Sequence, residues 1–327
     1  MEEVRSYLES HGVREKLEAA VRGAVSEGAD DPLAYIAGAL VAPPPLALEA
    51  DSARDGSSDG RPFFLGANWK CKIERRAHAV ELCAALAAKA ALFPADVELV
   101  LFVPALLIDA CCRALASCPR FSVGAQNVWD AGPMGAHTGC TTAAALAGCG
   151  VRWVMLGHSD RRNALGESSE LIGQKAHAAL AAGLNVNVTV GETKAQREAG
   201  VHLDALSAQL APLVSAMAPE GSQPDDPEGV GEWSRVVLAY EPVWAIGEGA
   251  TPCSPEEMQA VHAHLRSYLA ANASPSAAER VRIAYTGSVS PANAASYRAL
   301  PECEGFVCGR ASLSADEFLA VALAGKE

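Results

Sequence analysis

The stretch that decides the fold spans residues 151–190 and reads VRWVMLGHSDRRNALGESSELIGQKAHAALAAGLNVNVTV. It begins with an apolar run at 151–156, continues through an Ala-rich amphipathic segment and ends with a second strand-like run at 185–190. The short apolar ends and the helical period between them predict a strand, a helix and another strand. This order predicts two parallel strands joined by a right-handed crossover.

The same unit recurs along most of the chain. Short strand-like runs alternate with segments of helical pattern, and eight such units in about 250 residues favour a closed (β/α)8 barrel. The pattern alone leaves an open doubly wound sheet as an alternative. The eight runs are residues 63–67, 97–103, 121–125, 151–156, 185–190, 235–240, 281–285 and 305–308.

Composition excludes several classes of protein. With 327 residues, half of them hydrophobic, the chain can bury a full core. Its net charge of -13, from 26 Lys and Arg against 39 Asp and Glu, disfavours nucleic acid as a partner. The chain contains no apolar run of the roughly 18 residues that a membrane span needs, and its start, Met1-Glu2-Glu3, is acidic where a targeting peptide is basic. We therefore expect a cytoplasmic protein.

The ten cysteines form no Cys-x-x-Cys pair and show no metal-ligand spacing. In a chain of this length they are expected to be free thiols in a reducing compartment. The sequence therefore predicts neither a disulfide framework nor a metal site.

A linker is predicted at residues 42–62, where APPPLALEADSARDGSSDGRP combines three consecutive prolines with Asp, Ser and Gly. It divides the chain into a short helical segment at 1–41 and the barrel domain at 63–327. These boundaries define the predicted domain organisation.

Polar side chains follow several of the predicted strands. Lys70 lies after the first strand, His158 after the fourth and Glu241 after the sixth, while Gly287-Ser288 and Gly309 follow the last two. Each residue alone fits a structural role, such as a solvated lysine or a hydrogen-bonded histidine. In a barrel, however, they meet at one rim. A cation, an imidazole and a carboxylate there favour proton transfer next to a carbonyl of an anionic substrate, with bare backbone amides for phosphate.

Motifs at these strand ends, in this order, resemble the triosephosphate isomerase family over nearly all of residues 63–327. The resemblance implies a (β/α)8 barrel that interconverts dihydroxyacetone phosphate and D-glyceraldehyde 3-phosphate in glycolysis and gluconeogenesis, without a metal or organic cofactor. The motifs are NWK at 68–70, GHSDRR at 157–162, GESSELIGQK at 166–175, AYEPVWAIG at 239–247 and TGSV at 286–289.

The resemblance also implies roles for individual residues. Glu241 is the base that moves a proton between neighbouring carbons, and a neutral His158 polarises the carbonyl. Lys70 neutralises the developing charge and holds the phosphate side, while Asn68 binds a substrate oxygen. Ser159 and Asp160 support the histidine and the lysine.

The resemblance to the family also implies a lid and a phosphate site. Residues 242–252 are the lid that excludes water, and Gly247, Ser288, Gly309 and Arg310 grip the phosphate.

Among the departures from the family pattern, three concern the lysine and the phosphate site. Asp160 replaces a Glu and is expected to hold Lys70 less well. Thr286 and Arg310 replace glycines, so a side chain at either place is expected to strain the turn or crowd the phosphate. Our hypothesis is an active enzyme with altered phosphate affinity or lid closure.

A dimer contact is also implied. The stretch 135–139, GAHTG, resembles the loop that inserts into a second subunit of the family, where Thr138 steadies the neighbour's Asn68 and Lys70. We therefore expect a homodimer.

The pattern of residues 4–41 predicts two short amphipathic helices. The second begins at Asp30-Asp31-Pro32, which supplies an N-cap and a first-turn proline. Neither can bury its apolar stripe alone, so a partner is required. The segment resembles the docking and dimerisation helices of protein kinase A regulatory subunits, whose groove accepts an amphipathic helix of an anchoring protein. This predicts a tether to a cytoskeletal or ciliary scaffold. A helical extension packed on the barrel and a disordered or targeting leader are the alternatives.

Two functions follow from these observations. The first is a triosephosphate isomerase that works through an enediolate intermediate. The second is a catalytically weakened or inactive relative that serves as a scaffold or docking protein, suggested by Thr286, Arg310 and the N-terminal helices.

Overall fold

A computed structural model describes residues 61–129, 137–217, 232–247 and 250–326, together with isolated positions between residues 17 and 36. The chain divides into two compact units, Met1–Ser57 and Ser58–Glu327. Most of the predicted helical segment and residues 42–60 of the predicted linker lie outside the described residues, so the proposed domain boundaries stay predictions.

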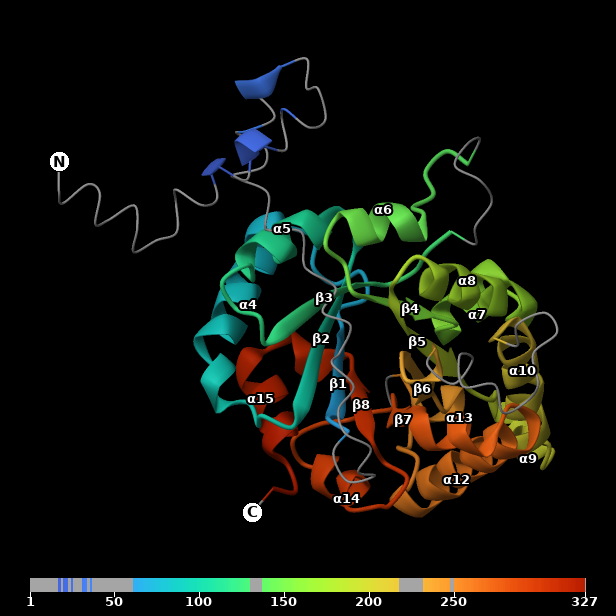
Figure 1. Cartoon of the computed structure of the whole chain (residues 1–327). Coiled ribbons are helices and arrows are strands. Elements are labelled where there is room, and N and C mark those ends of the chain that lie inside the picture. The colour runs from blue at the N-terminus through green and yellow to red at the C-terminus, as the bar shows by residue number, and fades with distance from the viewer. Residues whose placement is uncertain are drawn as a thin grey trace. The chain divides into compact units, whose positions relative to one another are not determined.

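The second unit is a closed barrel of eight parallel strands in sequential order (Figure 1). The last strand pairs with the first, Phe64 lying beside Gly305, and this closes the sheet. The predicted (β/α)8 fold is confirmed, and the alternative of an open sheet is wrong. The strands are β1 (Phe63–Asn68), β2 (Val97–Val103), β3 (Phe121–Ala125), β4 (Trp153–Leu156), β5 (Asn185–Val190), β6 (Val236–Tyr240), β7 (Arg282–Tyr285) and β8 (Gly305–Cys308).

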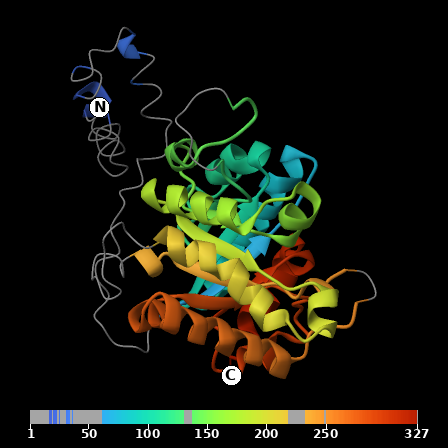
Figure 2. The same cartoon turned by 90° about the vertical axis from the view of Figure 1, so that its right-hand side faces the viewer.

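Helices cover the outside of the barrel (Figures 1 and 2). Several begin at side-chain caps; Ser254, for example, forms a capping box with Glu257. Among the described residues of this unit, the α-helices are α4 (Arg76–Ala88), α5 (Ile108–Ala114), α6 (Ala143–Gly148), α7 (Ser159–Leu165), α8 (Ser169–Ala181), α9 (Lys194–Glu198), α10 (His202–Met217), α12 (Pro255–Asn272), α13 (Pro275–Arg280), α14 (Ala294–Arg298) and α15 (Ala315–Leu323). Short 3-10 turns are η1 (Ala90–Leu92), η2 (Ala105–Leu107), η3 (Val243–Ala245) and η4 (Arg310–Leu313).

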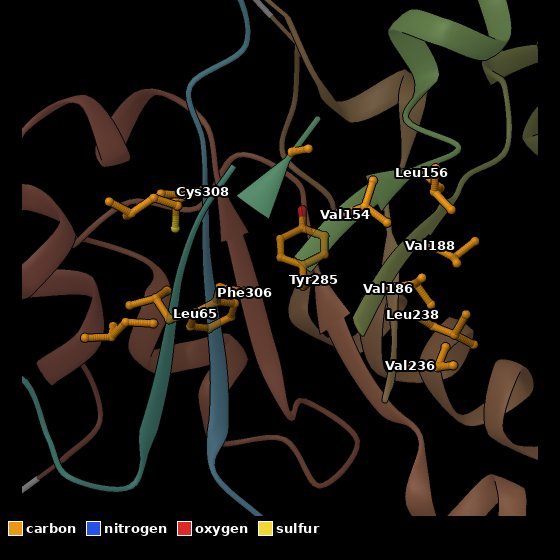
Figure 3. Close-up of a cluster of buried hydrophobic side chains, with 14 of the residues drawn as sticks. Leu65, Val154, Leu156, Val186, Val188, Val236, Leu238, Tyr285, Phe306 and Cys308 are labelled. Atoms are coloured by element: carbon orange, nitrogen blue, oxygen red, sulfur yellow. The ribbon is translucent and has the colours of Figure 1, made fainter. Parts of the chain in front are cut away.

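The strands bury both of their faces. Side chains such as Phe64 and Val237 fill the inside of the barrel, whereas Leu65 and Leu238 belong to the layer between strands and helices (Figure 3). Because side chains alternate along a strand, Asn68 lies on the same inward face as Phe64, four residues earlier, and the same spacing turns Glu241 inward after Val237. The alternation thus directs Asn68 and Glu241 toward the end of the barrel where the strands have their carboxyl termini. We call this end the mouth.

Ion pairs close the amino-terminal end. Arg282 is buried there and bonds Glu98 Oε2 at 2.6 Å and the carbonyl oxygen of Pro62 at 3.2 Å. Arg61 Nη2 bonds Glu304 Oε1 at 2.6 Å. The residues that lead into β1 are therefore fixed at the end of the barrel opposite the mouth.

Two general findings apply to the described residues. No helix among them is both long and apolar enough to cross a membrane. The ten cysteines are free thiols.

Candidate active site

The ends of three strands bring the predicted catalytic side chains to the mouth. Glu241 directly follows β6 and His158 follows β4, and both are buried. Glu241 Oε1 lies 3.1 Å from His158 Nε2. Lys70, after β1, places Nζ 3.1 Å from Asp160 Oδ2, and that oxygen lies 3.5 Å from His158 Nδ1. The carboxylate, imidazole and ammonium groups thus form one connected cluster.

The hydrogen bonds of His158 define its tautomer. It caps helix α7, and its Nδ1 accepts the backbone N–H of Asp160 at 3.1 Å. Nδ1 is therefore unprotonated, and Nε2 carries the proton that faces Glu241. Burial lowers the pKa of His158, and although Glu241 and Asp160 raise it while Lys70 lowers it, the net shift is downward. The imidazole is neutral at pH 7 and offers Nε2–H to the mouth.

The backbone around Glu241 fixes the position of its carboxylate. Its N–H donates to the carbonyl oxygen of Val190 at 2.8 Å, and its Oε2 accepts the N–H of Ser159 at 2.8 Å. A Cβ at Gly191 would lie 1.8 Å from the Glu241 carbonyl oxygen, so only glycine fits there. Gly191 was not predicted from the sequence, although a glycine directly after a predicted strand indicates such a position.

Lys70 has a left-handed backbone, with φ of 48°, which costs a side-chain-bearing residue about 1 kcal/mol or more. Hydrogen bonds hold it there. Its N–H donates to Asn68 Oδ1 at 3.0 Å, and its carbonyl oxygen accepts Gln126 Nε2 at 2.9 Å. Gln126 Nε2 also lies 3.1 Å from the carbonyl oxygen of Phe102. Gln126 was not predicted, because nothing in its local sequence indicates that it reaches β1.

The shorter side chain of Asp160 still reaches Lys70. The two side chains lie 3.1 Å apart, and the expectation that Asp160 holds Lys70 less well than a Glu stays a prediction. Both side chains are partly exposed, at 33% for Lys70 and 61% for Asp160, so water weakens this ion pair.

The base of the predicted lid is anchored to a buried glutamate. Trp244, in η3, donates its Nε1–H to Glu192 Oε1 at 2.7 Å, and Tyr240 donates its hydroxyl to the same oxygen at 3.0 Å. The guanidinium of Arg197 lies 4.3 Å from the centre of the Trp244 ring. Glu192 was not predicted from the sequence. Of the predicted lid, residues 248 and 249 lie outside the described part.

The predicted phosphate-binding residues come from three neighbouring segments. Ser288, after β7, donates its hydroxyl to the carbonyl oxygen of Ala245 at 3.3 Å. Gly247 has a φ of 109°, a conformation that favours glycine. Gly309 and Arg310 follow β8, and the side chain of Arg310 is exposed at the start of η4. These residues lie at the same end of the barrel as Lys70.

The expected backbone strain at the two replaced glycines is wrong. Neither Thr286 nor Arg310 has a positive φ. Thr286 is buried, its N–H donates to the carbonyl oxygen of Tyr240 at 2.8 Å, and its hydroxyl donates to that of Val307 at 3.1 Å. The threonine is therefore integrated into the strand ends.

A second buried carboxylate lies close to the site. Glu167 Oε1 accepts Lys175 Nζ at 2.7 Å and Arg161 Nε at 2.7 Å. Burial raises the pKa of Glu167, but the hydrogen bonds from Arg161 and Lys175 outweigh it and hold the pKa below its usual value. This cluster joins α7 to α8 and was not singled out from the sequence.

Thr138 is exposed. The part of its predicted interface loop at residues 130–136 lies outside the described residues, and the contact with a second subunit stays a prediction.

The chemistry available at the mouth is acid–base and electrostatic. No cluster of three or more His, Cys, Asp and Glu side chains in the described ranges could hold a metal ion. The groups that face one another are a carboxylate, a neutral imidazole and an ammonium group.

Comparison with protein families gives a match over most of the chain. The family model described as triosephosphate isomerase matches residues 63–324, which is the barrel unit with its strand ends.

Proposed function

Because the chain belongs to the triosephosphate isomerase family, we propose that it interconverts dihydroxyacetone phosphate and D-glyceraldehyde 3-phosphate through an enediolate. The observation that carries this proposal is the buried carboxylate of Glu241, 3.1 Å from a neutral imidazole Nε2. A base and a hydrogen-bond donor so close together can act on neighbouring atoms of one small substrate.

The proposed reaction moves two protons and no other atoms. Glu241 takes a proton from the carbon beside the carbonyl, and the electrons of that C–H bond form a carbon–carbon double bond. The carbonyl π electrons move to oxygen, where the Nε2–H of His158 and the charge of Lys70 stabilise them. Glu241 then returns its proton to the neighbouring carbon, while the hydroxyl proton passes between the two oxygens through His158.

The resting contact must open for this chemistry. Glu241 and His158 touch directly, so the substrate has to enter between them. We propose that the lid rearranges at the same time, because Trp244 lies three residues after Glu241 and is anchored to Glu192.

The critical experiment is a coupled isomerase assay on the wild type and on Glu241→Gln. The variant keeps an oxygen that can accept the Ser159 N–H, but its neutral amide cannot act as the base. We expect turnover to fall about 10³-fold, with circular dichroism unchanged. An inactive scaffold would show negligible activity in both proteins.

We propose that Arg310 alters phosphate binding, because an exposed guanidinium follows Gly309 where the family has glycine. Arg310→Gly should change the KM for the triose phosphate. An unchanged KM would remove this proposal.

We also propose a homodimer, supported by the family and by the exposed Thr138. Light scattering should give twice the chain mass of 33.9 kDa. A mass of one chain would contradict it.

A scaffold tether through residues 4–41 is proposed on separate grounds. In the first unit, the apolar side chains of Leu17, Val21, Val25 and Leu33 are exposed, and exposed apolar groups at helical spacing indicate a partner. The partner would be an amphipathic helix of a cytoplasmic anchoring protein. Light scattering and helix capture on a peptide of residues 1–45 test this; an unfolded monomer that captures no helix would exclude it.

A further inference from the structure

A cavity of about 280 Å³ lies beside Glu241. Of the predicted site, Ser159, Glu241 and the lid residue Val243 line the cavity, whereas Asn68, Lys70, His158 and Ser288 do not. The cavity is therefore distinct from the space between the base, the imidazole and the ammonium group. The lining side chains that matter most are Ser159, Arg162, Asn163, Ser169, Gln196 and Glu241.

Two lining groups have unused hydrogen-bonding capacity. Ser159 is only 4% exposed, and within the described part of the chain its hydroxyl has no partner. Gln196 uses its Oε1 to accept the N–H of Thr193 at 2.9 Å, and its amide nitrogen has no partner among the described residues. A buried polar group such as the Ser159 hydroxyl favours a ligand that can bond it, and the half-buried Gln196 amide lines the same cavity and can donate to that ligand.

Arg162 supplies further donors. Three of its five N–H groups are used, which leaves one on each terminal nitrogen. Burial lowers the pKa of Arg162 to about 10, and it remains a cation at neutral pH. The three used donors go to the carbonyl oxygen of Gly157 at 2.7 Å, Ser169 Oγ at 2.9 Å and the carbonyl oxygen of Thr189 at 3.1 Å.

The charges of the cavity favour a neutral ligand. The cation of Arg162 and the carboxylates of Glu167 and Glu241 all line it, so either kind of ion would meet a like charge as well as an opposite one. The volume lies just below the range of roughly 300–1,000 Å³ that is usual for drug-sized ligands. We propose that the cavity binds a small neutral polyhydroxy compound, of the size of glycerol or a triose without phosphate.

Such a ligand would act on the position of the catalytic carboxylate. In the resting site Glu241 is held by the Ser159 N–H and by His158 Nε2, and the substrate must separate Glu241 from His158. A polyol that bonds Ser159 and Glu241 favours the resting position, and Val243 of η3 lines the same cavity. The ligand therefore inhibits the isomerase and, by linkage, weakens the binding of an enediolate analogue. This consequence rests on the proposed function, whereas binding does not.

Binding is tested by titrating the full-length protein with glycerol and following backbone amide signals by NMR. We expect saturable shifts at Gly157, Ser159, Asn163 and Gln196. Gln196→Glu keeps the acceptor for the Thr193 N–H but removes the free amide donor, so it should weaken binding about fivefold. Glu198→Gln is the matched control on the same helix, because Glu198 is exposed and does not line the cavity.

Three results would overturn the proposal: shifts that never saturate, equal affinity in wild type and Gln196→Glu, or stronger shifts at the same amides with inorganic sulfate. The first would mean that the cavity holds water only. The last would make it an anion site.

Activity provides an independent readout. Glycerol should inhibit the wild type and Glu198→Gln alike, and Gln196→Glu about fivefold less, with polyethylene glycol as the viscosity control. Equal inhibition of all three proteins would contradict the link to Glu241. A wild type without isomerase activity would refute the proposed function and leave the binding titration to decide this inference.

Discussion

Charged side chains at the amino-terminal end of the barrel are paired with one another, whereas those at the mouth keep bonding positions for a ligand. At the amino-terminal end Arg282 bonds Glu98 at 2.6 Å, and Arg266 Nη2 bonds Glu304 Oε2 at 2.5 Å. At the mouth, Glu241 has only a backbone N–H and an imidazole as hydrogen-bond partners in the described structure. Saturated pairs stabilise the fold, while unsaturated groups at the mouth can exchange their partners for a substrate.

Among the tests of this contrast, the largest effect is expected at Lys70, the residue at the mouth with a left-handed backbone. Lys70→Gly removes the cation and fits the left-handed backbone without penalty. We expect kcat/KM to fall about 10²–10³-fold, with no comparable loss in the free energy of unfolding. Enzyme kinetics and urea unfolding on the same samples check this. Equal losses in both measurements would mean that Lys70 serves the fold and would erase the contrast between the two ends.

The matching change at the other end should do the opposite. Arg282→Met leaves Glu98 partly buried without its partner, so we expect the free energy of unfolding to fall by about 3 kcal/mol. The kcat of the folded variant should stay within twofold, because Arg282 is far along the strand from the mouth. In a double variant with Glu98→Gln, part of the stability should return. No recovery would show that the two side chains act independently.

The pH dependence of the free energy of unfolding should report on the buried His262. Burial lowers the pKa of His262 to about 4, from an ordinary value of 6.5. The folded state therefore binds fewer protons than the unfolded state between these values, and stability falls as pH decreases from 6.5 to 4, by about 3 kcal/mol. Urea midpoints measured across this window should decline less steeply in His262→Gln. A parallel decline would assign the loss to other groups.

The lowered pKa of His158 should appear in the pH dependence of kcat/KM. Its imidazole stays neutral below pH 6.5 because burial lowers its pKa, so the acid limb of kcat/KM should begin below that pH. An acid limb centred at 6.5 would mean that the histidine keeps its ordinary pKa in the working enzyme.

The order of strands and helices could be predicted because strand and helix periods are local, whereas the pattern alone left open whether the sheet closes into a barrel. The largest boundary error was at β4, expected from residue 151 but starting at Trp153. Val151 donates its N–H to the carbonyl oxygen of Leu146 and therefore completes the end of α6. That hydrogen bond depends on how the preceding helix ends, which the apolar run itself does not reveal.

Some residues of the site could likewise be predicted from the sequence, and others could not. Lys70, His158 and Glu241 could be chosen because they follow strands and match a family motif. Their supports could not: Gln126 reaches Lys70 across 56 residues, and Trp244 reaches Glu192 across 52. Such contacts depend on how neighbouring strands are staggered, and the periodicity of single segments carries no information on that stagger.

The smallest expected effect concerns the ion pair between Lys70 and Asp160. Asp160→Glu lengthens the partner of Lys70 by one methylene but keeps the charge and the backbone N–H that bonds His158 Nδ1. Because the pair is exposed to water, its contribution is at most about 1 kcal/mol, and kcat/KM should change less than about fivefold. Asp160→Pro is the informative counterpart: it removes the N–H itself and frees Nδ1 to take the proton. If Asp160→Glu proves as damaging as Asp160→Pro, the carboxylate rather than the backbone N–H governs the histidine, and the mouth depends on a charge pair just as the amino-terminal end does.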